Sequence, residues 1–125
     1  DILFRKAFYT ELLNDYFDDE RTIIITTHQV EEIENILTDV MFIDDGKIVL
    51  NETIESIGDR YTELMVGPDQ AERARGFAPL TERQVFGKSV LTFEGVARAE
   101  LQELGEVRTP GLADLFVAKL SKEVA

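Results

Sequence analysis

The chain has 125 residues with 25 acidic and 13 basic side chains, a net charge of −12, and no cysteine. The length fits one domain or two small ones, and the lack of cysteine excludes disulfides and thiolate metal sites. The acidic balance argues against a nucleic-acid partner, because nucleic-acid-binding surfaces need clustered lysine and arginine. Since there is also only one histidine, we expect no metal site. The sequence starts at Asp1 without a methionine, and we expect it to be a fragment of a longer protein.

The acidic charge is concentrated in the first half of the chain. Residues 1–60 carry 5 basic and 15 acidic side chains, a net charge of −10, whereas residues 61–125 carry 8 and 10, a net charge of −2. This change predicts a domain boundary near residue 60, with one domain over residues 1–60 and a second over residues 61–125.

The first domain is predicted to be part of an α/β sheet. Residues 22–27 form a β-branched apolar run, which is typical of a buried strand in a parallel sheet. Asp45-Gly46 lies between two apolar runs and predicts a hairpin turn, and Thr53 is expected to cap the helix behind it. In chain order, the predicted elements are a helix over residues 2–17, strand 22–27, a short helix 30–37, strands 39–43 and 47–51, and a helix 53–61.

Residues 61–125 show a different pattern, in which short strands and helices follow one another as β-α-β-β-α-β. This is the order of the ferredoxin-like arrangement, and small α+β domains of this kind often act as regulatory or interaction modules. A last helix is expected to begin at Thr109-Pro110. In chain order, the predicted elements are strand 62–66, a short helix from residue 68, strand 83–86, a turn at 87–88, strand 89–93, helix 96–104, strand 106–108 and helix 109–120.

His28 stands directly behind the strand predicted over residues 22–27. Ligands of open α/β sheets bind beyond the carboxyl ends of such strands, although a histidine there is also often a polar cap on a turn. The sequence continues from Thr27-His28 to Glu32-Ile33-Glu34, Asp39 and the segment from Phe42 to Val49. This succession resembles the tail of an ABC-type ATPase domain. It departs from the family at Val40, where arginine is more common.

The resemblance implies roles for two residues. His28 would be the switch histidine, which contacts the γ-phosphate of ATP and helps to place the attacking water. Asp1 would be the D-loop aspartate, which reaches across the ATP-bound dimer; a simple helix N-cap is the alternative for this residue. The phosphate-binding lysine, the magnesium-binding aspartate, the catalytic glutamate and the signature motif have no counterpart here and are expected upstream of Asp1.

The end of the chain adds a second similarity. Residues 109–120 combine a helix start with an apolar stripe, and they resemble the Pro-Ser-Leu-Glu-Asp-Val-Phe ending of ATPase subunits that serve ABC-2-type exporters. The matching residues are Pro110, Leu112, Asp114 and Phe116, and the departures are Gly111 and Ala113.

The resemblance implies a subunit that hydrolyses ATP with Mg²⁺ and drives export through a membrane permease. Its partners would be a second ATPase subunit and the permease, which would hold it in the cytoplasm on the inner face of the cell membrane. The fragment alone is expected to bind neither ATP nor Mg²⁺ and to be inactive, and to self-associate through the unpaired edges of strands 22–27 and 39–43. The alternatives are a free-standing ferredoxin-like interaction or regulatory module, and the tail of a non-transporter ABC-type ATPase.

Three other motifs are interpreted as structural. Gly87-Lys88-Ser89 imitates the end of a phosphate loop, but Glu82 stands where that loop needs glycine, so a hairpin turn is expected. The acidic residues 18–20 and 44–45 are expected to lie in a solvated loop and in a turn.

Overall fold

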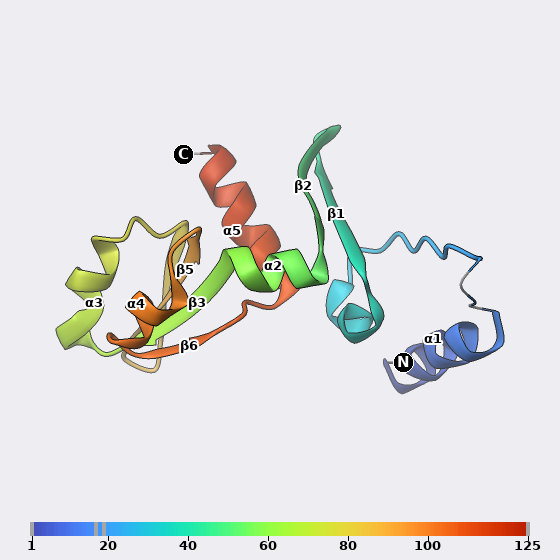
Figure 1. Cartoon of the computed structure of the whole chain (residues 1–125), viewed down its shortest axis with the longest axis horizontal. Coiled ribbons are helices and arrows are strands. Elements are labelled where there is room, and N and C mark those ends of the chain that lie inside the picture. The colour runs from blue at the N-terminus through green and yellow to red at the C-terminus, as the bar shows by residue number, and fades with distance from the viewer. Residues whose placement is uncertain (1, 17, 19, 125) are drawn as a thin grey trace. The chain divides into compact units, whose positions relative to one another are not determined.

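The computed structural model describes residues 2–16, 18 and 20–124, and the chain divides into two compact units. Unit 1 is Asp1–Leu37 and unit 2 is Thr38–Ala125. This division falls before the change in charge near residue 60, and the domain boundary expected there stays a prediction. Helices and antiparallel sheets alternate along the chain, so the fold is mixed α/β (Figure 1).

Unit 1 contains helix α1 (Ile2–Tyr16) and two 3₁₀ helices, η1 (Val30–Glu32) and η2 (Glu34–Ile36). The prediction of a buried strand over residues 22–27 is wrong, because this segment is irregular and Ile24 is 84 % exposed. A strand needs hydrogen bonds to a neighbouring strand, and the described residues of unit 1 include none.

One further expectation for unit 1 needs correction. The single helix expected over residues 30–37 is replaced by the two 3₁₀ helices, which meet at the buried residue Ile33. The helix expected over residues 2–17 forms as α1 over residues 2–16, and its apolar residues Phe4 and Phe8 are both more than half exposed. Helical spacing of apolar residues predicts a helix, but it does not by itself supply a surface for that helix to pack against.

Unit 2 begins with a hairpin of β1 (Asp39–Asp44) and β2 (Lys47–Thr53), followed by α2 (Ile54–Arg60). Asp45 and Gly46 form the turn with φ angles of 50° and 74°, and both angles are positive as a type I′ turn requires. The predicted helix cap is also confirmed, because the Thr53 hydroxyl accepts a hydrogen bond from the Ser56 N–H at 3.0 Å.

The rest of unit 2 is a four-stranded antiparallel sheet with three helices. The strand order is β4-β5-β3-β6, and the predicted succession β-α-β-β-α-β is confirmed. The β4–β5 turn lies at Phe86–Gly87 and not at 87–88, because an aromatic residue typical of strands occupies the first turn position. The elements are β3 (Tyr61–Val66), α3 (Pro68–Arg75), β4 (Thr81–Val85), β5 (Lys88–Glu94), α4 (Arg98–Gln102), β6 (Glu106–Arg108) and α5 (Leu112–Val124).

One face of this sheet carries the hydrophobic core. Antiparallel pairing places Leu64 of β3 opposite Leu91 of β5, and alternate residues of both strands face α3 and α4. Each fully buried leucine or phenylalanine stabilises the fold by about 1.5–3 kcal/mol. The buried cluster consists of Leu64, Val66, Leu91 and Phe93 from the sheet with Ala71, Ala74, Leu101 and Leu104 from the helices and the turn behind α4.

Helix α5 joins the hairpin to the sheet. It contacts both β2 and β4 (Figure 1). The Phe116 ring packs edge-to-face on Phe42 of β1 with 5.1 Å between the ring centroids. Phe42 is buried together with Val40 and Leu50 on the same side of the hairpin. The hairpin therefore belongs to the same compact unit as the sheet.

Candidate functional site

His28 lies at an exposed bend of unit 1, between the irregular segment and η1. The Thr27 hydroxyl accepts a hydrogen bond from the Gln29 N–H at 3.0 Å, so a short side-chain turn encloses His28. Because the strand over residues 22–27 is not formed, the position of His28 behind a buried strand is not observed. Its role toward ATP stays a prediction, and Asp1, the second predicted site residue, lies outside the described residues.

Arg5 of α1 contacts the residues immediately behind His28. Its Nη1 donates a hydrogen bond to Oε1 of Gln29 at 2.7 Å, and its Nε lies 3.3 Å from Oε2 of Glu32. Sequence analysis did not find Arg5, because no periodicity or motif links residues 24 positions apart. The contact depends on how α1 packs against η1.

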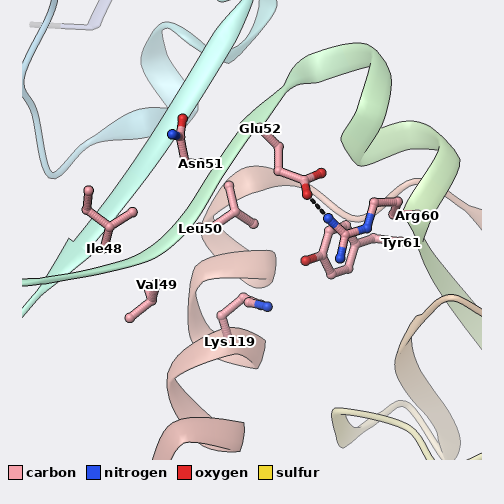
Figure 2. Close-up of a pocket in the computed structure, with 8 residues that line it drawn as sticks. All are labelled: Ile48, Val49, Leu50, Asn51, Glu52, Arg60, Tyr61 and Lys119. Atoms are coloured by element: carbon pink, nitrogen blue, oxygen red, sulfur yellow. Dashed lines mark ion pairs between the residues drawn. The ribbon is translucent and has the colours of Figure 1, made fainter.

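A cavity of about 310 Å³ lies in unit 2. It opens between β2, the end of α2, the start of β3 and α5, as Figure 2 shows. The cavity could not be predicted from the sequence, because four separate elements supply its walls. The lining residues are Ile48, Val49, Leu50, Asn51, Glu52, Arg60, Tyr61 and Lys119.

Charged groups surround the buried Tyr61 at one end of this cavity. Arg60 pairs with Glu52 (Figure 2). Arg60 also pairs with Glu94, and the Lys119 Nζ lies 3.5 Å from Oε1 of Glu94. The Arg60 and Lys119 cations lie 5.5 Å and 5.7 Å from the centre of the Tyr61 ring. The charges of the two cations and the two carboxylates cancel, so the cavity favours neither an anionic nor a cationic ligand. The arrangement holds the hairpin, α2, β5 and α5 together.

A second polar cluster surrounds Glu63, on the face of β3 opposite the core. Oε1 of Glu63 accepts a hydrogen bond from Arg108 Nε at 2.5 Å, while Oε2 is buried and lies 3.6 Å from Arg83 Nη2 without a hydrogen bond. Arg83 in turn lies 3.7 Å from a carboxylate oxygen of Asp114. The adjoining cavity of about 50 Å³ has room for a water molecule or two. This cluster connects β3, β4, β6 and α5.

The remaining motifs have structural positions. Gly87 lies in the β4–β5 turn, whereas Lys88 and Ser89 begin β5. Asp44 ends β1, and Asp45 lies in the β1–β2 turn. Across residues 2–16, 18 and 20–124, no group of histidine and carboxylate side chains is arranged to hold a metal ion. None of the helices in that part of the chain is long and apolar enough to span a membrane.

Comparison with known proteins gives no match. No protein-family model fits the sequence, and no curated protein or solved structure is significantly similar to the chain. Function must therefore be argued from the residues and their geometry.

Proposed function

We propose that the chain is the C-terminal part of an ABC-type ATPase subunit that drives a membrane exporter. One observation supports the proposal: the sequence after Thr27-His28 forms a β-hairpin. Asp39 begins β1, Asp45-Gly46 forms the turn and Lys47 begins β2. In the intact subunit, ATP hydrolysis would drive transport, with a second ATPase subunit and a membrane permease as partners on the cytoplasmic face.

The second half of the chain supports an accessory domain in this subunit. The strand order β4-β5-β3-β6, with α3 and α4 in the two crossovers, favours a ferredoxin-like arrangement over other small α+β folds. The exporter-like ending lies on α5, where Phe116 contacts Phe42 of the hairpin. This contact suggests a structural role for the exporter-like ending, which is to attach the accessory domain to the preceding hairpin.

The proposed role of His28 is to donate a hydrogen bond to the γ-phosphate and to help place the attacking water. Positioning and charge stabilisation dominate phosphoryl transfer, so one well-placed donor is important for the rate. The described residues do not fit Mg²⁺, since they provide no suitable group of carboxylates. The proposal therefore places the metal ligands and the phosphate loop N-terminal to Asp1.

The test is ATP turnover by the natural polypeptide that carries these residues. We expect magnesium-dependent turnover in the wild type and a loss of about 10²–10³-fold in kcat for His28→Ala, as for other preorganised donors. Glu31→Ala is the matched control, because Glu31 is also exposed in the same loop region and has no assigned role. Equal turnover in wild type and His28→Ala would remove His28 from the mechanism, and no turnover in the wild type would overturn the proposal.

The compact second unit favours one alternative, a free-standing interaction or regulatory module. Unit 2 has its own buried core and its own sheet, as such a module needs. ATP turnover distinguishes the two functions, because the module would have none with or without His28.

A further inference from the structure

Arg5 holds the loop that presents His28. Its guanidinium group extends from the first turn of α1 and contacts Gln29, the residue before η1, and Glu32, the last residue of η1. The backbone N–H of Glu32 also donates a hydrogen bond to the Gln29 carbonyl at 3.1 Å. The turn that starts directly behind His28 is therefore closed by its own backbone and anchored to α1 through one side chain.

The chemistry of these contacts requires arginine. A planar guanidinium group presents several N–H donors in fixed directions, so Nη1 can donate to the Gln29 amide while Nε faces the Glu32 carboxylate. The Glu32 side chain is only 8 % exposed, and Nε of Arg5 is buried and makes no hydrogen bond, so its contact with Glu32 is an ion pair. A lysine would keep the charge but would lose the fixed arrangement in which Nη1 binds Gln29 while Nε faces Glu32.

We propose that Arg5 is a positioning residue for His28, an inference that rests on the proposed function. Arg5 does not touch the nucleotide. Its guanidinium group fixes the Gln29 side chain. The Thr27 hydroxyl accepts a hydrogen bond from the Gln29 N–H, so the chain is held on both sides of His28. The exposed segment before Thr27 forms no strand that could support the loop. The contact of the loop with α1 is therefore important. A displacement of about 1 Å at a positioning group can cost roughly 10²-fold in rate.

The first test measures the order of the loop and does not depend on ATP. His28 is the sole histidine of the chain, so its resonances are assigned without ambiguity. In Arg5→Gln and in Gln29→Leu, we expect the backbone amide order parameters of His28 and of the residue at position 29 to fall from about 0.85 to below about 0.6. Lys6→Gln is the matched control, because it removes one cation from an exposed position of the same helix. Unchanged loop order in both test variants, with α1 intact, would overturn the inference.

The second test is a double-mutant cycle on ATP turnover by the natural polypeptide. We expect Arg5→Gln to lower kcat by about 10–100-fold with little change in KM, and Arg5→Lys to restore only part of the rate. In the His28→Ala background, Arg5→Gln should cause no further loss, because its effect acts through His28. If Arg5→Gln lowers kcat by the same factor in both backgrounds, or in neither, the positioning role of Arg5 is overturned while the proposed function stands. A wild type without turnover would overturn the proposed function and the catalytic role of Arg5 with it.

Discussion

The turn between β4 and β5 combines two positive φ angles with a large, fully exposed aromatic side chain. Phe86 and Gly87 have φ angles of 49° and 80°, and the Phe86 side chain is fully exposed. Glycine adopts such angles freely, whereas phenylalanine pays a steric cost that no packing offsets here. In the corresponding turn at Asp45–Gly46, the first position is an aspartate, which tolerates a positive φ angle.

We therefore predict that Phe86→Asn stabilises the protein by about 1 kcal/mol, the typical cost of a left-handed residue. Asparagine before glycine is the preferred pair of a type I′ turn. Urea unfolding measures the change, with Phe86→Leu as the control that removes the ring and keeps the strain. A loss of stability in Phe86→Asn, or an equal gain in Phe86→Leu, would contradict this account.

A second prediction at this scale concerns the carboxylate of Glu82. Two hydrogen bonds from Arg75, at 2.8 Å and 2.7 Å, lower the pKa of Glu82 below its ordinary value, and Gln84 and Ser89 lower this pKa further. Since the pKa is lower in the folded state, the stabilising contribution is present above the ordinary glutamate pKa and is lost as the pH falls through the lowered value. Titration of the Glu82 carboxyl by NMR should give a midpoint that rises in Arg75→Gln. It should not move in Arg73→Gln, a change in the same helix turn.

At the scale of elements, Gly105 is required by a close approach between chain segments. A Cβ atom at this position would lie 2.2 Å from the carbonyl oxygen of Met65 in β3, next to the place where β6 pairs. Gly58 lies inside α2, where a Cβ atom would meet only the Thr109 hydroxyl at 3.9 Å. The two glycines thus have opposite roles.

We predict that Gly105→Ala destabilises unit 2 by about 1–3 kcal/mol, because backbone atoms must move apart. Gly58→Ala should stabilise it by about 0.5–1 kcal/mol, since alanine favours a helix interior. Denaturant unfolding of the two variants and the wild type measures both changes in stability. Gly105→Ala without a loss of stability would show that β6 is not held against β3 as described.

The elements of unit 2 could be predicted from the sequence because their signals are local. Asp45-Gly46 specifies its own turn and Thr53 caps its own helix, so neither needs information from elsewhere in the chain. Residues 22–27 have an equally clear strand pattern, but a strand exists only beside a partner. The contact of Arg5 with Gln29 could not be predicted either, since it depends on tertiary packing.

At the scale of the whole molecule, exposed apolar segments predict self-association. Ile24 is mostly exposed in the strand-prone segment, and Met41, Ile43 and Ile48 are exposed on the outer side of the hairpin. Free strand edges with apolar side chains pair with other copies. Light scattering should show a mass above the monomer that rises with concentration, and Ile24→Lys should lower it more than Thr10→Lys on α1. A monodisperse monomer at all concentrations would refute the prediction.

The proposal that the chain belongs to the C-terminal part of an ABC-type ATPase is tested most directly by the sequence of the gene upstream of the Asp1 codon. The account predicts a continuous reading frame that encodes a strand followed by a glycine-rich phosphate loop of the form G-x-x-x-x-G-K-[S/T]. It also predicts an acidic strand for Mg²⁺ and a signature motif between that loop and Asp1. An upstream segment without a phosphate loop would contradict the proposal and favour the interaction module.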